Sequence, residues 1–143
     1  MINFFTKFVL KNIDTIYHRK KILNYFKKNK FKFKLILDIG SNIGEYTVLF
    51  KNINKNIEVV CFEPQKEVFK ELKTNLKNYK KIKLYNVAIG SSNTYKNLNI
   101  NLGSSYISSF SHFNKNSNYY KIRNSLLKQR DKIKYEKVKV LRL

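Results

Sequence analysis

LILDIGSNIGEY, residues 35–46, joins a short apolar run to a segment with two glycines, and this pattern indicates the fold class. The run LILDI (35–39) predicts a strand buried on both faces, because such strands are almost continuously apolar. Residues 42 to about 53 follow with apolar side chains at helical spacing. The chain holds only four glycines, so Gly40 and Gly44 together indicate a tight turn between strand and helix.

The alternation of strand and helix continues to residue 89. A second buried strand is predicted at EVVCF (58–62), a helix at 65–78 beside Pro64, and a third strand at KLYNVAI (83–89). Strand, helix, strand, helix and strand at this spacing predict a βαβαβ unit with a parallel sheet and right-handed crossovers. We therefore expect an α/β fold.

An amphipathic helix is predicted at the N-terminus, over residues 1–30. Apolar residues recur there at helical spacing between lysines from residue 2 to about 28. Such a helix either covers a face of the following domain, residues 31–143, or lies on a membrane surface. Its wide apolar stripe favours packing against protein.

The sequence after residue 90 is more polar and less regular. It predicts a strand or hairpin, then a long loop over residues 103–116. A short helix is predicted within 118–134, and alternation of apolar and basic residues predicts a half-exposed strand over 137–143. We find no internal repeat and no linker between domains.

The composition limits the class of protein. The chain of 143 residues is 43% hydrophobic with one proline, which indicates one globular domain. A single cysteine, Cys61, excludes an internal disulfide, and no apolar run reaches the ~20 residues that a membrane span needs. With no recognisable signal peptide, we expect a cytoplasmic protein. His18 and His112 have no suitable neighbours in the sequence, so we expect no metal site.

The formal net charge of +21 suggests an alternative function. A field of this size attracts nucleic acid through its phosphates, so the chain could be a basic nucleic-acid-binding protein. Only four of the 30 cations are arginine, however, the residue best suited to bidentate contacts with phosphate and bases. The lysine excess, beside 19 asparagines, indicates a compositional bias. We therefore expect no specific nucleic-acid partner.

The glycine turn and an acid on the next strand predict a ligand site. Gly40 lets a ligand approach the main chain, Gly44 has no side chain to obstruct it, and the first amides of the helix favour an anion. Asp38 is expected to project into the crevice at the carboxyl ends of the strands, where it could hold an ammonium group. Glu63, at the end of the neighbouring strand, could accept hydrogen bonds from two ribose hydroxyls.

Together these groups suit a nucleoside that carries an amino-acid tail. The dinucleotide fingerprint G-x-G-x-x-G is replaced here by D-x-G-x-x-x-G, which disfavours a nicotinamide dehydrogenase. The simpler alternative is that Gly40 and Gly44 only shape a strand–helix turn and that Glu63 is a solvated acid.

Three motifs carry a resemblance to a known family. They are LILDIGSNIGEYTVLF, VVCFEP and NVAIG, in this order and spacing. The chain resembles the FkbM-type family of class I S-adenosylmethionine-dependent methyltransferases. The motifs match up to about residue 110, and KVKVLRL (137–143) resembles a later strand of the family, so the resemblance covers the N-terminal portion of its domain. It implies a Rossmann-like fold, S-adenosyl-L-methionine as cofactor and O-methylation of a hydroxyl on a small molecule or sugar.

The resemblance also implies which residues bind the cofactor. They are Asp38, Gly40, Asn42, Gly44, Glu63, Val87 and Ala88. By the family pattern, the glycines and the asparagine shape the loop beneath the methionine part, and the aspartate lies near its amino group. The glutamate binds the ribose hydroxyls, and the last two residues lie near the adenine.

The family's later strands and its substrate-facing acidic motif have no counterpart in the 143 residues. We therefore expect a cofactor-binding half of the domain, without an identified catalytic residue, that binds the donor weakly and is inactive alone. An inactive remnant that folds poorly is a further alternative. LILDI would become an apolar edge strand, which is an aggregation hazard. The methyl acceptor and the oligomeric state stay open.

Overall fold

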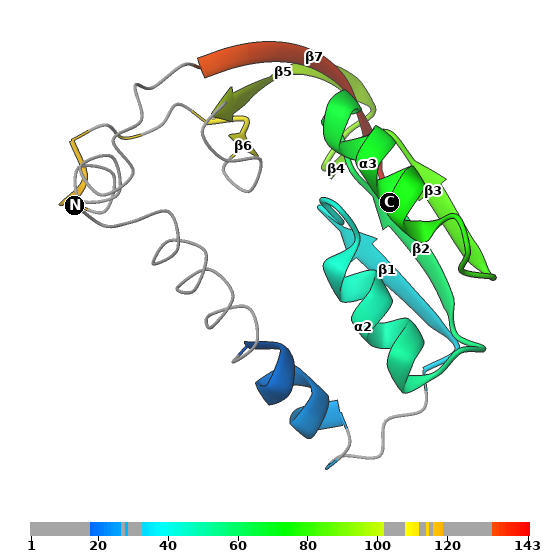
Figure 1. Cartoon of the computed structure of the whole chain (residues 1–143). Helices are drawn as coiled ribbons and strands as arrows, with labels where there is room; N and C mark the ends of the chain where they lie inside the picture. Colours follow the sequence, from blue (N-terminus) through cyan, green and yellow to red (C-terminus); the bar gives the residue numbers. More distant parts are fainter. Residues whose placement is uncertain are drawn as a thin grey trace.

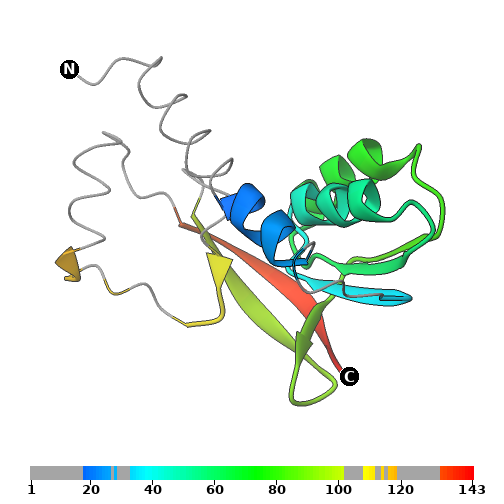
Figure 2. The same cartoon turned by 90° about the horizontal axis from the view of Figure 1, so that it is seen from below.

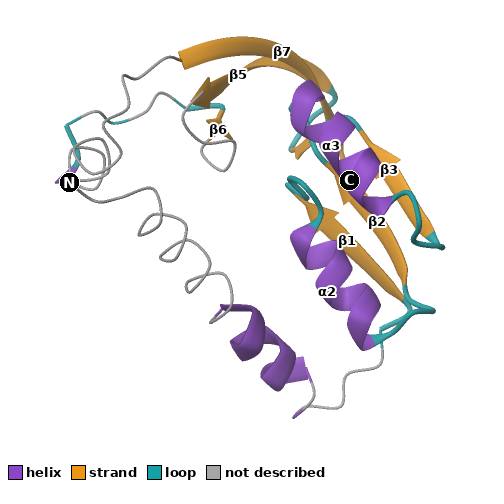
Figure 3. Cartoon of the chain, viewed as in Figure 1, coloured by secondary structure: helices purple, strands orange, loops and turns teal. Residues whose placement is uncertain are grey.

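The chain is a mixed α/β protein built around two β-sheets (Figure 1). The computed structural model describes residues 18–26, 28, 33–101, 108–111, 114, 116–118 and 133–143. Figure 3 shows that the two labelled helices accompany one sheet, whereas the second sheet continues beyond them. The predicted α/β class is confirmed at this level.

The first sheet is parallel and contains the predicted βαβαβ order. Its elements are β1 (Leu35–Ile39), α2 (Glu45–Ile53), β2 (Glu58–Phe62), α3 (Lys66–Leu76) and β3 (Ile82–Tyr85). The strand order is β1-β2-β3, and Asp38 pairs with Cys61 in the register of the first two strands. Both helices lie on the same side of the sheet (Figure 2). The carboxyl ends of β1 and β2 therefore meet at one edge of the sheet.

The second sheet was not foreseen as a separate unit. Its strands are β4 (Ala88–Gly90), β5 (Thr94–Asn101), β6 (Ser108–Ser109) and β7 (Ile133–Arg142), in the order β4-β7-β5-β6. The strands β5 and β7 pair antiparallel over their full overlap, while β4 runs parallel to β7. The predicted strand at the C-terminus is confirmed as β7, and β6 lies within the segment expected to be a loop.

The third predicted strand, residues 83–89, was wrong as one element. It divides into β3 and β4, which belong to different sheets. The side chain of Asn86, between them, donates to the carbonyl oxygens of Glu63 at 2.8 Å and Pro64 at 3.0 Å. These bonds tie the break to the end of β2 and let the chain leave the first sheet.

Each sheet has its own buried cluster. Val59, Cys61 and Leu72 are central to the first cluster, between the parallel sheet and α3. The second cluster comprises Ala88, Leu98, Ile100, Val138 and Val140 from three strands of the second sheet. Cys61 is a fully buried core residue, as its apolar strand predicted.

The strand β1 is not buried on both faces as predicted. It is the edge strand of its sheet, and its outward side chains Leu35, Leu37 and Ile39 are 51%, 46% and 55% exposed. The expected apolar edge is thus confirmed for the part of the chain that the structure describes. The helix α2 also begins later than residue 42, because the left-handed φ angles of Asn42 (48°) and Gly44 (90°) interrupt a right-handed helix.

The described part of the N-terminal helix, residues 18–26, packs against the domain. The Phe26 ring meets the Phe50 ring of α2 edge-on at a centroid distance of 5.4 Å, and Arg19 pairs with Glu45 at 3.1 Å. Residues 1–17 and most of the helix predicted within 118–134 lie outside the described residues. No described helix is long and apolar enough to cross a membrane.

Candidate functional site

The turn between β1 and α2 is tied to the end of β2. The amides of Gly40 and Ser41 both donate to the carbonyl oxygen of Phe62, at 2.9 and 3.1 Å. Gly40 has a φ angle of 76°, in the left-handed region that favours glycine. These bonds fix the turn directly beside the residue that follows Phe62, which is Glu63.

Glu63 is the centre of the site, because its carboxylate bridges the two strand ends. One oxygen, Oε2, accepts the Asn42 amide at 2.9 Å, and the other, Oε1, accepts the Gln65 amide at 2.8 Å. The side chain therefore points into the turn and not into solvent, and the residue is 3% exposed. The structure thus brings together the turn and the acid that the sequence singled out.

The pKa of Glu63 is raised above its usual range. Burial is the main cause, since it disfavours the charged form, and the nearby charges of Asp38 and Glu136 add to it. The two amide hydrogen bonds act in the opposite direction. Each carboxylate oxygen has two lone pairs, so the carboxylate can still accept hydrogen bonds from a ligand.

A cavity of about 370 Å³ lies in front of Glu63. Its lining residues are Gly40, Asn42, Glu63, Pro64, Gln65, Leu98, Ser108, Ser109 and Phe110. The first sheet supplies an acid and a bare backbone, while the second supplies apolar surface and hydroxyls. The buried Ser108 hydroxyl has no hydrogen-bond partner among the residues that the structure describes. An orphaned polar atom in a cavity wall indicates that a polar ligand or water belongs there.

The two glycines of the turn have different roles, contrary to expectation. A Cβ on Gly40 would meet nothing within 4 Å, so this residue keeps the cavity mouth open. A Cβ on Gly44 would lie 2.9 Å from Cδ1 of Leu72, inside the contact between α2 and α3. The expectation that Gly44 clears the path of a ligand is therefore wrong, because its missing side chain makes room for α3.

Asp38 does not project into this cavity as expected. Its Oδ2 accepts a hydrogen bond from the Thr47 hydroxyl at 2.5 Å, and Thr47 lies on the buried face of α2. Burial raises the pKa of Asp38, and hydrogen bonds from Thr47 and Ser41 oppose this rise. The carboxylate thus holds the start of the helix. Thr47 was recognised only as an inward-facing residue in the sequence.

The amides of the turn are also less available than expected. The amide of Ile43 bonds to Oδ1 of Asn42 at 2.8 Å, and the Gly44 amide bonds to the Ser41 carbonyl at 2.8 Å. With the Asn42 amide bound to Glu63, the turn satisfies these donors internally. The expected anion cradle is therefore not supported at residues 40–44.

The remaining expected site residues, Val87 and Ala88, do not line the cavity. Both are buried, and Ala88 belongs to the core of the second sheet. Conversely, Gln65, Leu98 and Phe110 line the cavity without having been singled out. The serine-rich stretch that contains Ser108 was the sequence signal for this wall, but it did not reveal the wall's position.

The site has no metal-binding character. Among the described residues, no group of three or more His, Cys, Asp or Glu side chains could hold a metal ion. No protein-family model matches the chain, and the search of the curated proteins finds no match.

Proposed function

We propose that the cavity in front of Glu63 binds S-adenosyl-L-methionine, and that the chain is the cofactor-binding part of a Rossmann-like, FkbM-type methyltransferase. The observation that carries this proposal is the Glu63 carboxylate, held by the Asn42 amide at 2.9 Å at the mouth of an open glycine turn. An acid that ends the second strand of a parallel unit is well placed to accept two ribose hydroxyls.

The residues around the cavity suit this ligand in part. Glu63 has lone pairs left for the ribose, Gly40 leaves the approach free, and the Ser108 hydroxyl lacks a partner within the described chain. The apolar surface of Leu98 and Phe110 offers a place for the adenine. We assign indirect roles to Asp38 and Gly44, which hold the turn and the start of α2.

The bound cofactor would supply an electrophilic methyl group on a sulfonium ion. The proposed acceptor is a hydroxyl of a small molecule or sugar, as the family resemblance implies. Methyl transfer by in-line displacement depends mainly on the positioning of the two reactants. We assign no catalytic base, and we expect the 143-residue chain alone to bind the donor without turnover.

Calorimetry with S-adenosylhomocysteine tests the proposal. We expect the wild type to bind and Glu63→Ala to lose about 1.5–3 kcal/mol, the range for hydrogen bonds to a charged group. The matched control is Glu71→Ala, since Glu71 is an exposed acid on α3 and its loss changes the net charge equally. Circular dichroism melts establish that all three proteins are folded.

Two results would contradict the proposal. A folded wild type without measurable affinity for S-adenosylhomocysteine removes the cofactor. Equal affinity of the wild type and Glu63→Ala removes Glu63 from the site.

A further inference from the structure

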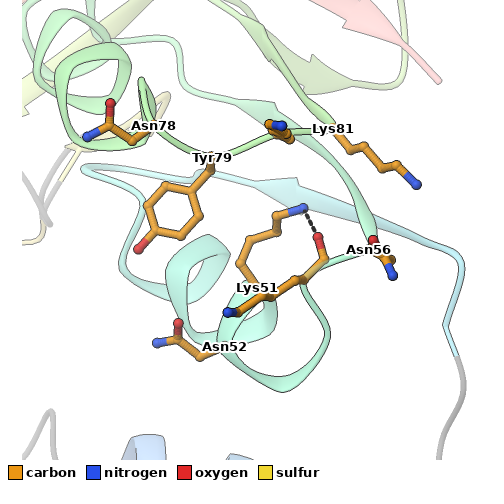
Figure 4. Close-up of a pocket in the computed structure, with 8 residues that line it drawn as sticks. Lys51, Asn52, Asn56, Asn78, Tyr79 and Lys81 are labelled. Carbon is orange, nitrogen blue, oxygen red and sulfur yellow. Dashed lines mark hydrogen bonds between the residues drawn. The ribbon is translucent and has the colours of Figure 1, made fainter.

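A second cavity, of about 390 Å³, lies at the opposite edge of the parallel sheet (Figure 4). Its lining residues are Lys51, Asn52, Lys55, Asn56, Asn78, Tyr79, Lys80 and Lys81. They come from the end of α2, the segment before β2 and the segment between α3 and β3. This edge holds the amino ends of β2 and β3, so the cavity is separate from the one at Glu63.

The lining is strongly cationic and contains no acid. Four of its eight residues are lysine, whereas lysine makes up 26 of the 143 residues of the chain. Asparagine supplies three more, and the eighth residue is Tyr79. The general lysine bias of the sequence accounts for scattered cations, but not for this concentration in one cavity without a carboxylate.

Lys51 is the buried cation of the cavity. Its ammonium donates to the carbonyl oxygens of Lys55 at 2.9 Å and Ile57 at 2.8 Å, and the residue is 3% exposed. Figure 4 shows it rising from α2 toward the Lys55 carbonyl. These bonds use two of its three protons. Burial lowers the pKa of Lys51, and the positive charge of Lys81 lowers it further, so an anion in the cavity would relieve this repulsion.

We propose that this cavity binds a phosphate-bearing ligand. The lysines supply charge, and the Asn52, Asn56 and Asn78 side chains offer both donors and acceptors for a polar group next to the phosphate. Tyr79 reaches from the segment after α3 toward α2, and its aromatic side chain can stack on a base (Figure 4). The phosphate comes either from a free nucleotide or from a single-stranded nucleic acid, which the experiment distinguishes.

The test uses two probes, adenosine monophosphate and a ten-nucleotide oligothymidylate. The double variant Lys55→Ala/Lys80→Ala removes two exposed lysines of the cavity, and the control Lys137→Ala/Lys139→Ala removes two exposed lysines of β7. We expect the cavity variant to bind at least one probe about tenfold more weakly than the control. Thermal melts of both variants report their folding.

The probes separate the two sources of phosphate. Binding of the mononucleotide with this loss indicates a free nucleotide as ligand. Binding of the oligonucleotide alone indicates nucleic acid, and the salt dependence of log K should then fall by about 1.4 in the cavity variant, ~0.7 for each lysine. Equal losses in both double variants would show a diffuse charge effect and overturn the proposal. So would the absence of binding to either probe at low salt.

Discussion

Gly44 and Leu72 are in contact so close that a Cβ on the glycine would lie 2.9 Å from Cδ1 of the leucine. Leu72 is fully buried on the inner face of α3. Gly44 precedes the first residue of α2 and has a φ angle of 90°. One residue therefore meets two demands, a left-handed backbone and a close approach of two helices.

We expect Gly44→Ala to lower the free energy of unfolding by about 2–5 kcal/mol. Overpacking of a core costs about 1–3 kcal/mol, and a left-handed conformation for a residue with a Cβ costs roughly 1–2 kcal/mol more. Urea denaturation measures the change. Gly40→Ala is the matched control, because its Cβ would meet nothing and only the backbone cost remains. Equal losses in the two variants would contradict the assignment of Gly44 to helix packing.

The same pair of variants should behave in the opposite way toward the cofactor. Gly40 lines the cavity at Glu63, so Gly40→Ala places a methyl group at its mouth. We expect the affinity for S-adenosylhomocysteine to fall about tenfold or more. Gly44→Ala, measured where it is fully folded, should keep its affinity within about threefold. Calorimetry at a temperature well below both melting transitions distinguishes the two, and an unchanged affinity of Gly40→Ala would argue against the cavity as the binding site.

The raised pKa of Glu63 predicts a pH dependence of stability. Its cause is mainly burial, with contributions from the charges of Asp38 and Glu136. Above the ordinary value of 4.5, the folded state holds a proton on Glu63 more often than the unfolded state does. Free energy of unfolding therefore falls as the pH rises through the interval between 4.5 and the raised pKa. Above that interval the loss stays constant.

Urea denaturation of the wild type and Glu63→Gln between pH 4 and pH 8, a range chosen to span the shift, isolates this contribution. The variant cannot ionise at this position, so the difference in stability between the two proteins should change with pH in favour of the variant as the pH rises. Affinity for S-adenosylhomocysteine should change the other way in the wild type, since the ribose hydroxyls require the carboxylate as acceptor. A difference in stability that is flat over the whole range would contradict the raised pKa.

The sequence was sufficient for those parts of the fold that depend on local pattern. Both β1 and β2 have the predicted bounds, because short apolar runs between polar segments mark strands. The parallel pairing followed from the helices between the strands. The second sheet depends instead on a non-local partner, since β4 pairs with β7 across a long insertion. Its separation from β3 rests on the hydrogen bonds of Asn86, which no periodicity reveals.

The candidate site shows the same division. Glu63 was placed correctly beside the turn, because the ends of adjacent parallel strands meet. The direction of Asp38 was missed, although strand alternation sets it opposite to Leu37 and Ile39 and so on the face that the helices cover. The role of Gly44 was beyond sequence reasoning, because it depends on a side chain of α3 brought close only by folding.

The exposed side of β1 predicts self-association that increases with salt. Leu35, Leu37 and Ile39 form an apolar row on an edge strand, a surface that can pair with another copy. The net charge of +21 keeps copies apart at low ionic strength, but the Debye length falls from ~30 Å at 0.01 M salt to ~10 Å at 0.1 M. We therefore expect sedimentation velocity to detect oligomers of the wild type as salt is added.

Leu37→Thr should reduce this association without loss of the strand, because threonine suits β-structure and adds a hydroxyl to the exposed face. Leu143→Thr is the control, since Leu143 is at least as exposed but follows the end of β7. We expect the control to associate like the wild type at each salt concentration, while Leu37→Thr stays monomeric to higher salt. If both variants associate equally, the contact between copies lies away from β1, and the charge of the chain then controls association through a different surface.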